Sequence, residues 1–202
     1  ASPVLSDLGE IDSGATETYI DFIRWSAEKY PAEQYALIVW NHGWGWTIAP
    51  VSGRKGVSSD DESGNDISIA NGEYEEIIEA ASSITGNRLS MVGMDACLMA
   101  SYEVAHAVNG LTDYLLASEE LEPGHGWDYR SLSILSAQAE VKPLELGRAI
   151  ADGFERQAKE WETASNITLS LLDMAHFDEF TNVFSDILVD ASDQIDQIGA
   201  EV

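Results

Sequence analysis

The chain has 202 residues, of which 45% are hydrophobic, and this size and composition suit a globular domain with a buried core. Its 10 basic side chains face 36 acidic ones, so the formal net charge is −26. A surface this negative repels phosphate and argues against nucleic-acid binding. Two interpretations of the charge stay open: a secreted or cell-surface protein with a solvated acidic exterior, or a protein from a halophile, in which salt screens the repulsion.

Two absences narrow the class of protein further. The sequence contains no run of about eighteen apolar residues, so it predicts no membrane-spanning helix. Cys97 is the only cysteine, which excludes an internal disulfide and a zinc site built on several cysteines. A lone cysteine is ordinarily a small buried hydrophobic residue, and only its surroundings indicate another role.

In the first half of the chain, helical and strand-like patterns alternate. Apolar side chains recur at helical spacing over 17–30, and a proline ends this predicted helix. Segment 35–40 is a continuous apolar run, typical of a strand buried on both faces. Residues 43–70 are rich in Gly, Ser, Asp and Asn and predict a long loop. Asn71 is then expected to cap a helix over 73–84.

The second half continues the alternation. Segment 89–94 predicts another buried strand, and Asp95-Ala96-Cys97 leads from it into a helix expected from about Leu98 to Val108. The remaining predicted elements are a strand at 114–117, a polar loop at 119–128, a helix at 144–161, a strand at 167–172 and a helix at 176–198. Such alternation with short connections predicts an α/β fold, with a parallel-dominated sheet sandwiched between helices.

Reactive side chains follow three of the predicted strands. His42 follows the first strand, Cys97 the second, and Glu119 with Glu120 the third. Ligand sites in open α/β sheets form beyond the carboxyl ends of the strands. If the three strands are neighbours, these side chains converge on one crevice.

Cys97 lies where a strand is expected to turn into a helix. The positive end of the helix dipole would favour the thiolate there, and the thiolate is the nucleophile. His42 is the natural acid/base partner, and Gly43 behind it lets a reacting carbonyl approach the backbone amide. On position alone, Cys97 could instead be an inert residue in the corner between strand and helix.

Three segments resemble the clostripain family of cysteine peptidases, which belongs with caspases, legumains and gingipains in one clan. The segments are Tyr35-Ala-Leu-Ile-Val-Trp-Asn-His42-Gly-Trp-Gly-Trp46, Asp95-Ala-Cys97-Leu-Met-Ala-Ser-Tyr-Glu103 and Ser118-Glu-Glu-Leu-Glu-Pro-Gly-His-Gly-Trp127. A histidine–glycine pair alone would be a weak signal. Its combination with the other two segments, each after a predicted strand, is specific.

The resemblance implies a caspase-like fold, with residues 1–202 as one peptidase domain that lacks the strand with which the family normally begins. It implies a catalytic dyad of His42 and Cys97, and an oxyanion hole formed by the amides of Gly43 and Cys97. The family cleaves after arginine or lysine, so the expected partner is a protein or peptide with a basic residue before the scissile bond. No cofactor is implied as required. Calcium is an option, for which the acidic run 60–66 offers oxygen ligands without the helix-loop-helix calcium pattern.

The resemblance also assigns roles to charged residues. Asp95 would lie in the pocket for the basic side chain, and its alternative role is to cap the following helix. Glu119 and Glu120 would add negative potential to that crevice, or else lie on an exposed loop. Family members cut themselves in the loop after the histidine strand, where Arg54 and Lys55 form the only adjacent basic pair of this chain. We therefore hypothesise self-cleavage after Arg54 or Lys55, against the alternative of two solvated loop residues.

Together these patterns predict a cysteine endopeptidase. One alternative is a catalytically silent caspase-like binding module, and another is a cysteine hydrolase that acts on amides other than proteins. An alkylating active-site probe separates the silent module from the enzymes. A panel of peptide substrates separates the two enzymes.

Overall fold

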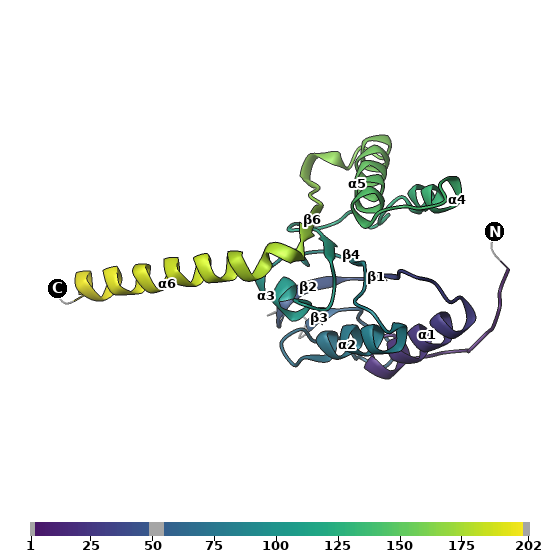
Figure 1. Cartoon of the computed structure of the whole chain (residues 1–202), viewed down its shortest axis with the longest axis horizontal. Helices are drawn as coiled ribbons and strands as arrows, with labels where there is room; N and C mark the ends of the chain where they lie inside the picture. Colours follow the sequence, from purple (N-terminus) through teal and green to yellow (C-terminus); the bar gives the residue numbers. More distant parts are fainter. Residues whose placement is uncertain (1–2, 49–54, 200–202) are drawn as a thin grey trace.

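The computed structural model describes residues 3–48 and 55–199 and has a four-stranded sheet at its centre (Figure 1). The strands of this sheet are β1 (Ala36–Trp40), β4 (Met91–Asp95), β5 (Tyr114–Ala117) and β6 (Ser170–Asp173). They stand in the order β1-β4-β5-β6, with β6 antiparallel to β5 and the other pairs parallel. Because helices cover both faces, the predicted parallel-dominated α/β fold is confirmed.

Two hydrophobic clusters, one on each face of the sheet, hold the helices in place. The helices are α1 (Thr16–Lys29), α2 (Glu73–Thr85), α3 (Tyr102–Ala107), α4 (Ile134–Ala137), α5 (Pro143–Glu160) and α6 (Phe177–Gly199). α1 and α2 lie on one face and α5 on the other (Figure 1). Along β4, Val92 and Met94 join the cluster under α1 and α2, whereas Met91 joins the cluster under α5. Successive side chains of a strand point to opposite faces, which explains why this central strand has no polar side chain before its last residue, Asp95.

The register of β1 and β4 brings the ends of both strands to the same level. Trp40, the last residue of β1, is opposite Asp95, the last residue of β4. The N–H of Asn41 then donates a hydrogen bond to the carbonyl of Asp95, with 3.3 Å between nitrogen and oxygen. The segments that carry His42 and Cys97 therefore leave the sheet side by side at one edge.

The prediction of a continuous loop over 43–70 is wrong. Gly43–Ile48 (β2) and Lys55–Val57 (β3) form an antiparallel pair. Glycine is depleted in strands, and its frequency in this segment hid the pattern. At Gly56 the glycine is needed, because φ is 60° and an added Cβ would lie 1.9 Å from the carbonyl oxygen of Ile67.

The cap predicted at Asn71 is also wrong. The residue before α2 is Gly72, whose φ is 82° and which has no side chain to offer. The side chain of Glu73, the first residue of α2, instead accepts a hydrogen bond from the N–H of Ser68 at 2.7 Å. A carboxylate in the first turn satisfies backbone donors and suits the positive end of the helix dipole.

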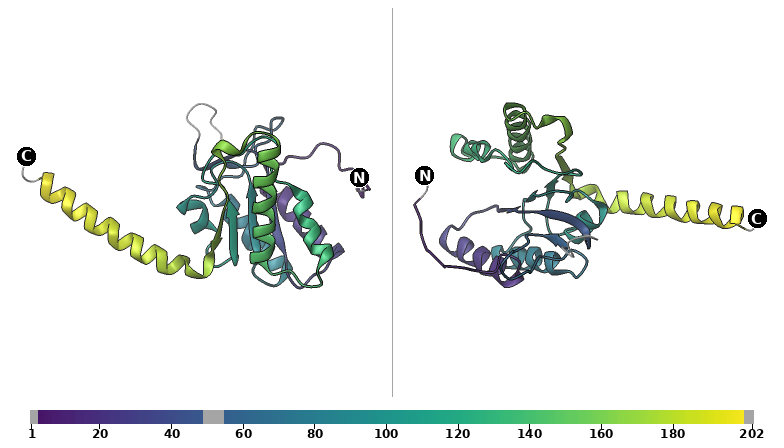
Figure 2. Two further views of the ribbon diagram at one scale, coloured as in Figure 1. Left: turned by 90° about the horizontal axis from the view of Figure 1, so that it is seen from above. Right: turned by 180° about the vertical axis from the view of Figure 1, so that it is seen from behind.

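α6 projects from the rest of the molecule (Figure 2). It begins beside β6 and carries exposed apolar side chains, among them Phe180, Val183 and Ile187. Within the described ranges, no helix is both long enough and apolar enough to cross a membrane.

Candidate active site

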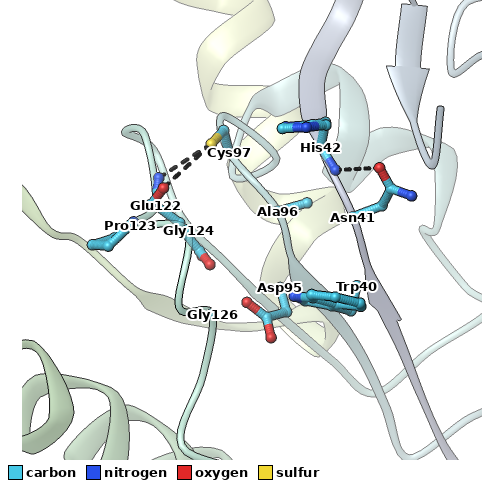
Figure 3. A pocket seen from close by; sticks show the side chains of 10 residues that line it. All are labelled: Trp40, Asn41, His42, Asp95, Ala96, Cys97, Glu122, Pro123, Gly124 and Gly126. Carbon is cyan, nitrogen blue, oxygen red and sulfur yellow. Dashed lines mark hydrogen bonds between the residues drawn. The ribbon is translucent and has the colours of Figure 1, made fainter. Parts of the chain in front are cut away.

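A pocket of about 280 Å³ opens at the carboxyl ends of β1 and β4 (Figure 3). The loop that follows β5 forms its opposite wall. The lining residues are Trp40, Asn41, His42, Asp95, Ala96, Cys97, Glu122, Pro123, Gly124 and Gly126. The predicted crevice beyond the ends of three strands therefore exists, and it is built from all three predicted segments.

The structure brings His42 and Cys97 to this one pocket. Figure 3 shows the imidazole and the sulfur at the same end of it. The side-chain oxygen of Asn41 accepts a hydrogen bond from the N–H of His42 at 2.6 Å, which fixes the turn behind the histidine. The His42 side chain is exposed and Cys97 is half-buried, so both can reach a bound substrate.

Cys97 lies in a turn that is docked onto the loop after β5. The backbone N–H of Glu122 donates a hydrogen bond to Sγ of Cys97 at 3.2 Å, and Sγ lies 3.8 Å from the Glu122 carbonyl oxygen. Just after Cys97, the Leu98 N–H donates to the carbonyl of Glu120, and the Ala100 N–H donates to that of Ser118. These backbone bonds hold the sulfur against the pocket wall.

The prediction that a helix begins at Leu98 is wrong. Leu98 has a φ of 62°, in the left-handed region, and α3 begins only at Tyr102. Ser101 caps that helix by accepting a hydrogen bond from the N–H of Val104. The helix dipole acts within about one turn of the terminus, so the dipole argument for Cys97 does not hold. The polar contact with the sulfur comes from the amide of Glu122 instead.

Gly43 lies against the turn that carries the cysteine. An added Cβ would lie 2.3 Å from the carbonyl oxygen of Cys97 and 3.0 Å from the side chain of Met99. Only glycine allows this approach of two backbones. The structure thus places the two residues predicted for the oxyanion hole next to each other, while the role of their amides stays a prediction.

Asp95 forms the floor of the pocket and is 2% exposed. Its carboxylate accepts hydrogen bonds from the Trp127 N–H at 3.0 and 3.2 Å, and from the Tyr129 hydroxyl at 2.8 Å. The alternative role as a helix cap is wrong, because Ser101 caps α3. An oriented carboxylate at the base of a pocket is suited to bind a cationic side chain.

Glu122 adds a second carboxyl group to the pocket, which the sequence analysis missed. Its Oε1 accepts a hydrogen bond from the indole N–H of Trp127 at 3.3 Å. Burial and the neighbouring Asp95 raise the pKa of Glu122 to about 9. Glu122 follows β5 in the same polar loop as Glu119 and Glu120, but only the path of that loop shows which glutamate points inward.

Glu119 and Glu120 lie outside the set of described residues that line the pocket. Glu119 accepts a hydrogen bond from the hydroxyl of Ser170 in β6, and its N–H donates to the Thr168 hydroxyl. Glu120 has an exposed side chain and uses its carbonyl to hold Leu98. Their predicted contribution of negative potential to the crevice stays a prediction.

The structure describes only one residue of the predicted self-cleavage pair. Arg54 lies outside the described residues, and Lys55 is the first residue of β3. Self-cleavage at this pair stays a prediction.

The acidic run 60–66, considered for calcium, is held by the backbone. Asp60 accepts hydrogen bonds from the N–H groups of Ser13, Glu62 and Ser63, which hold its pKa below the ordinary value. Over residues 3–48 and 55–199, no group of three or more His, Cys, Asp or Glu side chains is arranged to hold a metal ion. Calcium binding stays a prediction.

A sequence profile described as the clostripain family, Peptidase C11, matches residues 5–201. The chain belongs to the clostripain family. Clostripain-family structures also share its fold. A secreted C11 cysteine protease from Bacteroides thetaiotaomicron in complex with an irreversible peptide inhibitor superposes with a TM-score of 0.71 at 19% identity, over 88% of this chain and 50% of that chain. No curated protein matches the sequence significantly.

Two more solved structures resemble this clostripain-family chain. A structure of the secreted C11 protease iotapain from Bacteroides thetaiotaomicron gives a TM-score of 0.65 at 20% identity, over 86% of this chain and 48% of that chain. An inactive zymogen C11 protease from Parabacteroides distasonis gives a TM-score of 0.55 at 22% identity, over 87% of this chain and 44% of that chain. The present chain thus spans about half the length of the structures that it matches.

Proposed function

We propose that this clostripain-family chain is the catalytic part of a cysteine endopeptidase that cleaves after arginine or lysine. One observation carries the proposal: His42 and Cys97 line the same pocket, and carboxyl groups of Asp95 and Glu122 lie within it. The pocket thus joins a nucleophile and an acid/base to a recognition site for positive charge.

In the proposed mechanism, the thiolate of Cys97 attacks the carbonyl carbon of the scissile peptide bond. The developing oxyanion accepts hydrogen bonds from the amides of Gly43 and Cys97. His42 protonates the departing amine, which leaves an acyl-enzyme thioester. Water, deprotonated by His42, then attacks the thioester and releases the carboxylic acid together with the thiol.

Asp95 would set the preference for a basic side chain. Its carboxylate is buried and oriented by Trp127 and Tyr129, so a guanidinium or ammonium group that enters the pocket replaces water as its partner. A charge-assisted hydrogen bond at such a site contributes about 1.5–3 kcal/mol. A neutral side chain would leave the carboxylate with less compensation for its burial.

The test uses peptide reporters that differ only in the residue before the scissile bond: arginine, lysine or neutral citrulline. We expect cleavage after arginine and lysine only, and complete loss in Cys97→Ala. His42→Ala should lower kcat/KM by about 10²–10⁴-fold. Asp95→Asn should lower kcat/KM for the arginine and lysine reporters about 10–100-fold. Turnover that survives in Cys97→Ala would contradict the proposal.

We further propose that the enzyme is produced as a precursor that cleaves itself after Arg54 or Lys55. The pair is basic, as the proposed specificity requires. Arg54 follows β2 in the sequence, and Lys55 is the first residue of β3. One matching structure is that of an inactive zymogen. Active protein should separate into two fragments at this pair, and Cys97→Ala protein should stay intact. An unchanged fragment pattern in a variant with alanine at both positions would contradict this cleavage site.

We also propose that the enzyme acts outside the cell. Two of the similar structures are of proteins described as secreted. Detection of the native protein in the cytoplasmic fraction alone would contradict this proposal.

A further inference from the structure

Glu122 contacts both functional parts of the pocket. Its backbone N–H binds Sγ of Cys97 at 3.2 Å, and its side chain lies beside Asp95 on the pocket floor. Figure 3 shows its backbone at the sulfur and Asp95 deeper in the pocket. The mechanism above gives no task to the carboxyl group of Glu122. A second buried acid next to an ordered carboxylate needs an explanation.

The hydrogen bonds of the two carboxyl groups differ. Asp95 accepts from the N–H of Trp127 with both oxygens and from the hydroxyl of Tyr129. Glu122 accepts only the indole N–H of Trp127 on Oε1, and its buried Oε2 receives no N–H or O–H donor within the described ranges. Donors stabilise a negative charge, so the site favours the charge on Asp95.

The two carboxyl groups line one small pocket, and burial together with the negative charge of Asp95 raises the pKa of Glu122. Two carboxylates in one buried site repel each other, so one of them favours the neutral form. The donors around Asp95 support a charge there, whereas Glu122 keeps a buried oxygen without a donor among the described residues. In the empty pocket, Glu122 therefore carries a proton, and the pair carries one negative charge.

We propose that Glu122 is a specificity-determining residue that holds a proton while the pocket is empty and releases it to solvent when a basic side chain enters. The inference rests on the proposed function. A cation that lies between the two carboxyl groups favours the charged form of both, so Glu122 ionises and becomes its second partner. The exchange balances: one proton leaves for each positive charge that enters, and the pocket with its ligand keeps the net charge that it had when empty.

This exchange selects for positive charge more sharply than Asp95 alone. A basic side chain gains two carboxylates, whereas a neutral one meets one carboxylate and one uncharged carboxylic acid.

The test measures proton release on binding by calorimetry at pH 7, in phosphate and in Tris, whose ionisation enthalpies differ. The protein is the full chain with Cys97→Ala, which prevents turnover. The probes are acetyl-arginine amide and its neutral isostere acetyl-citrulline amide. We expect about one proton released per bound arginine probe and none with the citrulline probe. In Cys97→Ala/Glu122→Gln, the arginine probe should bind about tenfold more weakly and release no proton.

Two controls make the result specific. Glu140→Gln removes the same charge from an exposed loop and should leave proton release unchanged. Infrared spectra should show a protonated carboxyl band in the empty Cys97→Ala protein that disappears with the arginine probe and is absent from the Glu122→Gln variant. This second measurement does not depend on the affinity of the variant.

The outcomes separate this inference from the proposed function. Arginine binding without proton release, or equal release in the Glu122→Gln variant, would overturn the inference even where the wild type cleaves arginyl peptides. Failure of Cys97→Ala to bind the arginine probe, together with no cleavage by the wild type, would overturn both.

Discussion

The backbone nitrogen of Glu122 lies 3.2 Å from Sγ of Cys97 and donates a hydrogen bond to it. The same residue extends its side chain toward Asp95, so a single position in the loop after β5 touches both the nucleophile and the floor of the pocket. The contact with the sulfur uses the backbone, and the contact with the floor uses the side chain. Substitution of the side chain can therefore separate the two.

Glu122→Gln should leave the reactivity of Cys97 intact while it weakens recognition of basic substrates. The amide that binds Sγ is unchanged, so we expect the rate of alkylation by iodoacetamide to stay within about twofold of the wild type. The kcat/KM for an arginyl reporter should fall about tenfold. Mass spectrometry of the alkylated protein and a fluorogenic assay measure the two effects. An equal loss in both would show that the side chain acts through the position of the cysteine.

Glu122 should also make the stability of the empty enzyme depend on pH. Its pKa is raised from 4.5 to about 9, so between these values the folded chain keeps a proton that the unfolded chain has released. The free energy of unfolding then falls as pH rises through this window, by up to about 1.4 kcal/mol per pH unit.

In Glu122→Gln this dependence is absent. The variant should have a Tm near that of the wild type at pH 5 and a higher Tm than the wild type at pH 8. Thermal unfolding followed by circular dichroism at both pH values tests this. If the Tm difference between the variant and the wild type is the same at pH 5 and pH 8, a raised pKa for Glu122 is ruled out.

Gly43→Ala should disrupt the pocket. The added methyl group would lie 2.3 Å from the carbonyl oxygen of Cys97, so one of the two backbone segments must move. We expect kcat/KM to fall at least about 10²-fold, because displacement of reacting groups by about 1 Å costs that much. Gly124→Ala is the matched comparison for folding, since an added Cβ there has no neighbour within 4 Å. Only Gly43→Ala should lower the Tm.

The strands that carry the site were predictable because of their burial. β4 is buried throughout, and β1 packs Val39 on one face and Ile38 on the other. Both strands read as apolar runs, which located His42 and Cys97 just beyond two strand ends. Parallel pairing then required the two segments to meet at one edge.

The path of the chain beyond the strand ends was not predictable in the same way. A leucine with a φ of 62° carries no sequence signal for the left-handed conformation, so the late start of α3 could not be seen at Leu98. Glu119, Glu120 and Glu122 look alike in the sequence. Tertiary contacts decide among them: Ser170 binds Glu119, while the indole of Trp127 binds Glu122 inside the pocket.

Asp128 stabilises the segment from which the donors to Asp95 come. It lies between Trp127 and Tyr129, is buried, and pairs with Arg130 at 2.7 Å and with Arg156 of α5 at 2.8 Å. These guanidinium groups hold the pKa of Asp128 well below its ordinary value. Its contribution to stability is therefore present above the unfolded pKa of about 3.9, and it is lost as pH falls through the folded pKa.

Arg156→Gln should lower the free energy of unfolding by about 1 kcal/mol at pH 7, because Arg156 is half exposed and Arg130 stays in place. The loss should shrink toward pH 3, where the unfolded carboxyl group is mostly protonated. Urea unfolding at both pH values measures it, with Arg148→Gln, an exposed substitution on the same helix, as the control. Because Asp128 anchors the segment that supplies Trp127 and Tyr129, Arg156→Gln should also raise KM for arginyl peptides. Equal losses of stability in the two variants would show that the pair with Asp128 contributes nothing specific.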